Sequence, residues 1–389
     1  MIYQSIKIKL ILLISFCICL CSASLAQDIQ RILDRAEQAM LKQSELHIKS
    51  TLYLHYESEE MYDTISNQLY LSFPNKKDYR YILYQGESKN SRFIYNGSEN
   101  FFLDLADSTI QVAKHPKEED IYSNTTFNIS YITWRLGLSS FKSNKDIGKK
   151  ISQETLNGKK VYKVELNIGQ NFLSKTGVLN PMKIKAENLL VVYLDQNTLL
   201  PLELISQRVG SKDFVKTKIE YLSLKGKRPN ETSWFTSSYS DFKPYKKITL
   251  AQLPLNQEAP TWSMNLANQH GSRSLAEYKG KYLILEFYIK NCGYCIEGVK
   301  KLNALQEKLA GKNVAILGVN SQDSETDLHS FIRTQNPAYD IVWDKDGSVS
   351  KAYGVDGVPH VFILDQEGKV IYNGALDENK LLSVLDGKI

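Results

Sequence analysis

The chain has 389 residues, of which 42% are hydrophobic and 23% charged, and its formal net charge is +5. This composition is typical of a globular protein of two or three domains, and it excludes both a disordered chain and an integral membrane protein. The basic excess is not gathered into a block, so a solvated basic face is the simplest interpretation and no nucleic-acid partner is predicted.

Residues 1–26 have the pattern of a secretory signal peptide. Two lysines precede an apolar run over residues 10–20, and the small residues that follow end in Ser-Leu-Ala before Gln27. Because the run is shorter than the about 20 residues that span a bilayer, cleavage is favoured over a membrane anchor. Lipid anchoring at Cys21 is less favoured, because a bulky leucine precedes that cysteine. We therefore predict an exported, periplasmic protein.

Cleavage before Gln27 would leave Cys292 and Cys295 as the only cysteines of the mature protein, since the other three lie in residues 1–26. A fold held together by disulfides has more cysteines than two. A structural zinc ion needs about four ligands, and the six scattered histidines offer no second pair at metal-binding spacing. We therefore predict no disulfide scaffold, no metal site and no cofactor.

Residues 27–240 are predicted to form a β-rich domain. Apolar residues recur at helical spacing over residues 28–43, which predicts one amphipathic helix. From residue 46 onward apolar and polar residues alternate, and turn dipeptides such as Asn96-Gly97 separate several of the segments. The predicted strands cover residues 46–56, 65–73, 79–85, 92–95, 101–105, 109–113, 161–168, 189–194, 199–208 and 216–223.

Many sequential strands with one apolar face predict a large antiparallel sheet that curls around a core. Residues 120–145 are predicted to hold a helix that covers this sheet or plugs its mouth. The order of elements, with phrases such as YNGSENFFLDL and VVYLDQNTLLPLELI, resembles the half-barrel fold of the LolA/LolB-like lipoprotein carriers. That resemblance implies a concave face that shelters an apolar ligand or a lipoprotein segment. The alternative is a hollow that the domain fills with its own side chains.

The alternation lapses and prolines appear over residues 241–257, which we interpret as a linker. Residues 258–389 then alternate between strands and helices. A strand over residues 281–289 leads into a helix that begins at the cysteine pair, and a strand over residues 313–319 follows, which is a βαβ unit. The other predicted elements are helices starting at Ser324, over residues 348–353 and over residues 377–385, and strands near residues 341–343 and after Pro359. This order predicts an α/β domain with a mixed sheet.

The motif Cys-Gly-Tyr-Cys over residues 292–295 indicates a redox couple. Cys292 falls where the helix begins, so free backbone N–H groups and the helix dipole favour its thiolate and make it the predicted nucleophile. Cys295 lies one turn inside the helix, close enough to form a disulfide with Cys292, and is the predicted resolving thiol. The intervening Gly293 and Tyr294 are predicted to set the balance between dithiol and disulfide.

Glu286 lies inside the apolar strand, six residues before Cys292. A carboxyl group buried there would be costly without a role, and its pKa would be raised by burial. We predict that it accepts the proton of Cys295 when that thiol attacks. The alternative is an edge carboxylate that reaches solvent or pairs with a lysine such as Lys290.

Pro359 is predicted to open a strand, where its missing N–H is tolerated. A cis peptide at this proline would place the backbone of Val358 beside the cysteines, where it could pair with an extended substrate. The neighbouring His360 is interpreted as an ordinary strand residue and not as an acid or a base.

Residues 253–389 resemble the TlpA/ResA-like thiol-disulfide oxidoreductases of the thioredoxin superfamily. The phrases EAPTW, GSRSLAEYKGKYLILEFY and YGVDGVPHVFILDQEGKVIYNG occur with the cysteine motif in the order and spacing of that family. The resemblance implies a thioredoxin-like fold in which Cys292 is the nucleophile, Cys295 the resolving thiol, Glu286 the buried acid and Pro359 the cis-proline.

Three positions depart from that family. Tyr288 stands in place of a common tryptophan, Lys300 in place of a helix-kinking proline, and Gly-Tyr in place of Gly-Pro between the cysteines. The Gly-Tyr dipeptide resembles the motif of periplasmic disulfide isomerases of the DsbC type. The direction of electron flow is therefore left open.

The leading hypothesis is an exported oxidoreductase that reduces or rearranges disulfides of proteins in the bacterial envelope, with a membrane or periplasmic electron donor. Val358, Pro359 and Tyr294 are its predicted substrate-binding residues. The alternative is a carrier or chaperone-like protein for an apolar ligand, with an auxiliary redox domain. A thiol peroxidase is disfavoured, because the segment FYIKNC has no proline or threonine before the cysteine.

Overall fold

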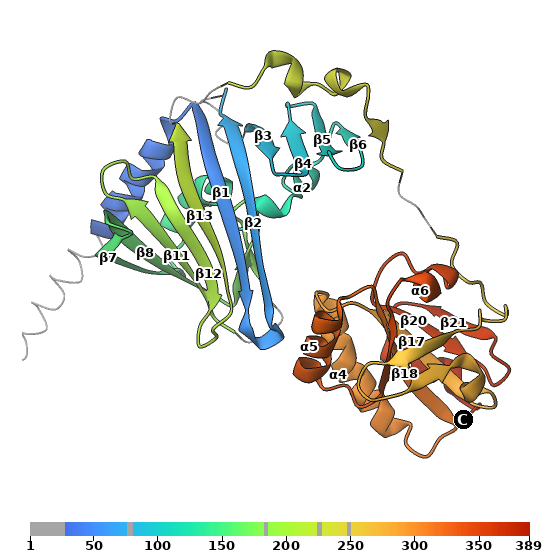
Figure 1. The fold of residues 1–389 in the computed structure, drawn as a ribbon. Helices are drawn as coiled ribbons and strands as arrows, with labels where there is room; N and C mark the ends of the chain where they lie inside the picture. The colour runs from blue at the N-terminus through green and yellow to red at the C-terminus, as the bar shows by residue number, and fades with distance from the viewer. Residues whose placement is uncertain (1–27, 76–80, 183–185, 224–227, 247–249) are drawn as a thin grey trace, which may run out of the picture. The chain divides into compact units, whose positions relative to one another are not determined.

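The structure is a computed structural model that describes residues 28–75, 81–182, 186–223, 228–246 and 250–389. The chain divides near residue 245 into two compact units, whose helices and strands are drawn in Figure 1. Each unit has its own hydrophobic core. The predicted signal peptide, with its three cysteines, lies outside the described residues. In these described ranges, no helix is long and apolar enough to cross a membrane.

The N-terminal unit is built on a 12-stranded sheet with the order β14-β6-β5-β4-β3-β2-β1-β13-β12-β11-β8-β7. Adjacent strands from β2 to β6, and from β1 through β13 to β7, are antiparallel. The strands are β1 (Glu45–Tyr56), β2 (Met61–Ser72), β3 (Leu83–Glu87), β4 (Ser91–Tyr95), β5 (Glu99–Asp104), β6 (Thr109–Lys114), β7 (Gly148–Leu156), β8 (Lys159–Gly169), β11 (Asn188–Asp195), β12 (Pro201–Arg208), β13 (Phe214–Ser223) and β14 (Lys243–Pro244). The predicted large antiparallel sheet is confirmed, whereas the resemblance to LolA/LolB-like carriers stays a prediction.

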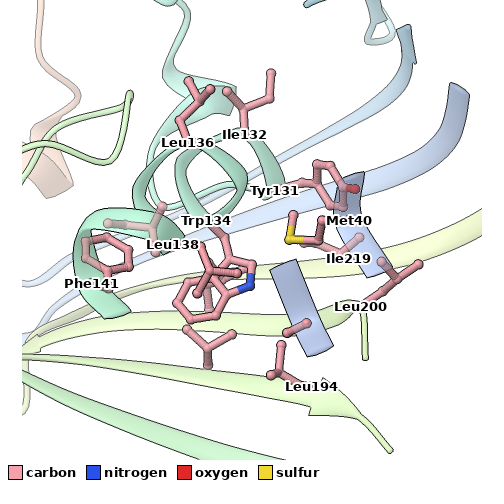
Figure 2. Close-up of a cluster of buried hydrophobic side chains, with 14 of the residues drawn as sticks. Met40, Tyr131, Ile132, Trp134, Leu136, Leu138, Phe141, Leu194, Leu200 and Ile219 are labelled. Atoms are coloured by element: carbon pink, nitrogen blue, oxygen red, sulfur yellow. The ribbon is translucent and has the colours of Figure 1, made fainter. Parts of the chain in front are cut away.

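Two helices bury their apolar faces in the main core of this unit. The helix over residues 28–41 buries the stripe that the sequence predicted, Ile29, Ile32, Leu33, Ala36 and Met40. The predicted covering helix is α3 (Tyr131–Ser143), which Ser130 caps by accepting a hydrogen bond from the Thr133 N–H. Figure 2 shows its fully buried Trp134 among Met40, Leu138, Leu194, Leu200 and Ile219. The described core is thus filled by the unit's own side chains.

Two strands of this sheet were not predicted. β7 forms one edge of the sheet, and most of its residues are exposed, so its sequence carries no clear apolar alternation. β14 lies within the predicted linker, but it pairs in parallel with β6 and forms the other edge. The segment just before β14 packs through Trp234, Tyr239 and Phe242 against a smaller core centred on Phe101. The beginning of the predicted linker therefore belongs to the sheet.

The C-terminal unit contains a seven-stranded sheet with the order β16-β15-β19-β18-β17-β20-β21. Strands β17, β18 and β19 are parallel, whereas β20 is antiparallel to β17 and β21 to β20. The strands are β15 (Ser263–Leu266), β16 (Ser272–Ser274), β17 (Tyr282–Tyr288), β18 (Val314–Ser321), β19 (Asp340–Asp344), β20 (His360–Leu364) and β21 (Val370–Gly374). The predicted mixed sheet is confirmed.

Four helices flank this sheet. Helices α4 (Gly293–Lys308), α5 (Glu325–Gln335) and α7 (Glu378–Leu385) contribute buried side chains to one core. The short helix α6 (Ser348–Ala352) is followed by Tyr353, which packs with Trp262 and Phe362 in a second core. As predicted, Ser324 caps α5 by accepting a hydrogen bond from the Asp327 N–H. The α4 side of the sheet carries the cysteine pair.

Candidate active site

The cysteine pair lies at the junction between β17 and α4. Cys292 is the N-cap residue of α4, and its sulfur accepts a hydrogen bond from the Cys295 backbone N–H at 3.2 Å. Cys292 is half-buried and Cys295 is fully buried. The two are joined by a disulfide, with their Cα atoms 5.2 Å apart. When the disulfide is reduced, the same N–H group and the helix dipole favour a thiolate at the more accessible sulfur, that of Cys292.

The loop before β20 lies against the outer cysteine. The Val358–Pro359 peptide is cis, and the carbonyl oxygen of Val358 lies 3.8 Å from the Cys292 sulfur. The predicted cis form and the predicted closeness of Val358 to the cysteines are therefore confirmed. Tyr294, between the two cysteines, is 79% exposed. The structure thus contains a half-buried sulfur with the backbone of the half-buried Val358 beside it, and an exposed aromatic ring at Tyr294. Their contact with substrate stays a prediction.

Glu286 is a fully buried carboxyl at the centre of the sheet. It lies on β17, between Gly318 of β18 and Val361 of β20. Its Oε2 accepts a hydrogen bond from the Tyr339 hydroxyl at 3.2 Å, and the described residues offer Oε1 no hydrogen-bond partner. Burial raises the pKa of Glu286 to about 8, so its carboxyl is mostly protonated at neutral pH.

The alternative environment considered for Glu286 does not occur. Its side chain does not reach solvent, and the Nζ atom of Lys290 lies 3.2 Å from the carboxylate of Asp327. The backbone N–H of Lys290 donates to Asp323 at 2.6 Å, and the Asn320 side-chain amide donates to the same oxygen at 2.7 Å. These bonds hold the loop that joins β17 to Cys292.

Two residues beside Glu286 were missed by the sequence reasoning. Tyr339 lies 53 residues further along the chain, and no local pattern connects it to the carboxyl. Gly298 lies on α4 one turn after Cys295 and is buried. A glycine in a helix interior costs about 1 kcal/mol relative to alanine, so its presence in an otherwise regular helix was a signal that could have marked the position.

The side chain of His360 contacts residues of its own sheet, as expected for an ordinary strand residue. Its Nε2 lies 2.6 Å from the side-chain oxygen of Asn373 on the neighbouring strand, and its ring packs on Phe362. The Asn373 side-chain amide donates in turn to the Leu253 carbonyl at 2.8 Å.

Over the part of the chain that the structure describes, no group of three or more His, Cys, Asp or Glu residues could hold a metal ion.

A family model and several characterised proteins match part of this chain in sequence. Residues 255–373 match the model of the AhpC/TSA family. The thioredoxin-like protein YneN of Bacillus subtilis is 30% identical over 135 residues, which are 33% of this chain and 78% of YneN. The thiol-disulfide oxidoreductase ResA of Bacillus thuringiensis subsp. konkukian is 27% identical over 121 residues, which are 31% of this chain and 69% of ResA.

Solved structures also match about a third of the chain. The thioredoxin domain of a thiol-disulfide oxidoreductase from Bacteroides vulgatus is 24% identical, with a TM-score of 0.33, and the match covers 35% of this chain and 100% of that one. A thiol:disulfide interchange protein from Bacteroides sp. is also 24% identical, with a TM-score of 0.32, and the match covers 35% of this chain and 93% of that one.

Proposed function

Because the chain belongs, through its C-terminal domain, to the TlpA/ResA-like thiol-disulfide oxidoreductases of the thioredoxin superfamily, we propose that Cys292 and Cys295 reduce or rearrange disulfides of exported proteins. The enzyme is a protein-disulfide oxidoreductase. The observation that carries the proposal is the Cys292–Cys295 pair at the start of α4, with the Val358 backbone beside the outer sulfur.

The reaction begins with the reduced pair. The Cys292 thiolate attacks one sulfur of a substrate disulfide, the substrate S–S bond breaks, and the departing substrate thiolate takes up a proton. A mixed disulfide between Cys292 and the substrate results. The Cys295 thiolate then attacks the Cys292 sulfur, and the second substrate sulfur departs as a thiolate. The substrate has gained two electrons, and the cysteine pair has lost them.

The buried cysteine must lose its proton before this second attack. A thiol in an apolar core resists ionisation, so a nearby proton acceptor is required. Glu286 supplies one in its ionised form, because burial raises its pKa from the ordinary 4.5 to about 8 and so makes its carboxylate a stronger base than an ordinary one. The higher pKa of the acceptor lowers the free energy that the proton transfer from the buried thiol requires. The same carboxyl can therefore return the proton when the couple is reduced again.

The substrate side of the site is proposed to be formed by Val358, Pro359 and Tyr294. An extended substrate segment can hydrogen-bond with the backbone of Val358 beside the Cys292 sulfur, in the manner of an added strand. The exposed ring of Tyr294 offers apolar area next to the reacting sulfur. An apolar ligand or lipoprotein segment on the N-terminal unit stays a prediction, and Trp134 and its neighbours pack together in the described core.

The direction of electron flow is proposed to be reduction or isomerisation, with a membrane or periplasmic donor restoring the dithiol. Thioredoxin-like couples span about −270 to −120 mV, which corresponds to about 7 kcal/mol for two electrons. Equilibration of the full chain with glutathione buffers measures the potential. A value near the oxidising end of this span would exclude the reductase assignment.

Trapping tests the proposed substrate class. A Cys295→Ser chain cannot resolve its mixed disulfides, so exported proteins that carry disulfides are expected to accumulate on Cys292 in the native envelope. The matched control is the double variant Cys292→Ser/Cys295→Ser, which should capture none of them. Equal capture by both variants would contradict the proposal, as would an absence of disulfide-containing partners on the trapping variant.

A further inference from the structure

A close approach between β17 and α4 occurs at Gly298, one turn beyond Cys295. A methyl group at this position, as in alanine, would lie 2.6 Å from the Oε1 atom of Glu286 and 3.2 Å from Cδ1 of Leu376. Real Cβ atoms essentially never approach another heavy atom to within 3.0 Å. Any other residue at position 298 would therefore displace the Glu286 carboxyl from its place against the helix.

The two oxygens of this carboxyl have different environments. Tyr339, just before β19, donates its hydroxyl hydrogen to Oε2 at 3.2 Å. Oε1 lies over Gly298 and has no hydrogen-bond partner among the described residues. Because Oε2 is held by Tyr339, Oε1 is the oxygen free to gain or lose a proton.

Oε1 lies beside the turn of α4 that carries the resolving thiol. Residues three apart on a helix are neighbours, with Cβ atoms about 5–6 Å apart, and Cys295 and Gly298 are both buried. Together with the close approach at Gly298, this spacing places Oε1 no farther than about 9 Å from the Cβ atom of Cys295.

We propose that Gly298 is a positioning residue: the space left by its missing side chain receives Oε1 of Glu286, and Tyr339 holds Oε2, so that Oε1 exchanges a proton with the Cys295 thiol. This inference rests on the proposed function. It also accounts for a glycine inside a helix, where it costs about 1 kcal/mol relative to alanine.

The step is the resolution of the mixed disulfide. The Cys295 S–H bond breaks, and its proton passes, directly or through one water molecule, to Oε1 of the ionised Glu286. The resulting thiolate forms a bond to the Cys292 sulfur, the bond between Cys292 and its partner breaks, and the partner leaves as a thiolate. Over the attack by Cys292 and this resolution together, the cysteine pair is oxidised by two electrons and the partner is reduced by two. In the reverse direction Oε1 returns the proton to the Cys295 sulfur.

The test separates the two thiol steps with dithiobis(nitrobenzoate), an aromatic disulfide whose thiolate product is coloured. The reduced full chain is used, with Cys17→Ser, Cys19→Ser and Cys21→Ser so that only the active-site thiols react. Attack by Cys292 releases a first equivalent of coloured thiolate, and attack by Cys295 releases a second. Stopped-flow absorbance yields both rates as a function of pH.

Gly298→Ala is expected to slow the second release at least about tenfold, which is part of the 10²–10⁴-fold contribution of general acid–base catalysis because the carboxyl is displaced and not removed, and to leave the first release within about twofold. It should also remove the inflection that Glu286 gives to the pH profile of the second release. Lys300→Ala, on the exposed face of the same helix, is the control and should change neither rate.

The decisive comparison repeats Gly298→Ala in a Glu286→Gln chain. If glycine acts through the carboxyl, the added alanine changes the second release by less than about twofold, because the proton acceptor is already lost. An equal loss in both backgrounds, or an equal slowing of both releases, would show general damage to the helix and would overturn the positioning role.

Tyr339→Phe provides a second test in case Gly298→Ala does not fold. It removes only the hydroxyl that holds Oε2, so it should slow the second release while the first is preserved. An unchanged second release in Tyr339→Phe would overturn the proposal. A parent chain that releases only one equivalent would instead overturn the proposed function itself, since no resolving step would exist.

Discussion

The buried carboxyl of Glu286 should make the stability of the C-terminal unit depend on pH. Burial raises the pKa of this group from the ordinary value of 4.5 to about 8 in the folded state. Between these two pH values the unfolded chain has lost the proton and the folded chain retains it, so stability falls as the pH rises. The slope is about 1.4 kcal/mol per pH unit, and the loss between pH 4.5 and pH 7 amounts to about 3.5 kcal/mol.

Replacement of Glu286 by glutamine isolates this effect, because an amide of similar shape cannot ionise. The free energy of any change in the hydrogen bond to Tyr339 is the same at every pH, whereas the free energy that ionisation of Glu286 costs depends on pH. Relative to the parent, the free energy of unfolding of Glu286→Gln should therefore rise by about 3.5 kcal/mol between pH 4.5 and pH 7, and level off above pH 8.

The measurement is urea denaturation of the oxidised full chain at a series of pH values. The control is Glu297→Gln on the exposed face of α4, whose difference from the parent should stay within about 0.5 kcal/mol. If the difference between Glu286→Gln and the parent were the same at pH 5 and pH 7, the pKa of Glu286 would not be raised in the folded state. Its carboxylate would then be too weak a base for the proton-acceptor role proposed for it.

Three further expectations follow from exposure, packing and capping. Tyr294→Ala should lower kcat/KM for a protein disulfide by about fivefold or more and leave reduction of a small aromatic disulfide unchanged, and an equal loss on both substrates would contradict a substrate-binding role. Trp134→Ala, at a fully buried position of the N-terminal core, should cost about 3–5 kcal/mol of stability in urea denaturation, and a cost below about 1 kcal/mol would show that the core is loosely packed there. Ser324→Ala should cost about 1 kcal/mol by removing the cap of α5, and Ser324→Asn should restore most of it; no loss in the alanine variant would refute the capping role.

The sequence was most informative where a feature depends on neighbouring residues. The helical stripe from Ile29 to Met40, the start of α4 at Cys292 and the cap of α5 at Ser324 are all local, and the structure contains each of them. The motif Cys-Gly-Tyr-Cys on a strand-to-helix junction identified the redox couple for the same reason. Glu286 was detectable because a carboxyl inside an apolar strand contradicts the local pattern.

Features that depend on distant pairing could not be predicted. β14 lies in a proline-containing stretch without alternation, and its pairing with β6 uses backbone groups from a segment more than 100 residues away. The hydroxyl of Tyr339 reaches Glu286 only because β19 and β17 lie two strands apart in one sheet. Gly298 contributes by the absence of a side chain, and such a space is visible only when both β17 and α4 are in place.

The catalytic role of Cys292 can be measured as the reduction of insulin disulfides by the full chain, with dithiothreitol as electron donor. We expect the parent chain to accelerate the reaction and Cys292→Ser to lower the rate to that of dithiothreitol alone, because the proposed nucleophile is then missing. A Cys292→Ser chain that reduced insulin as fast as the parent would contradict the account.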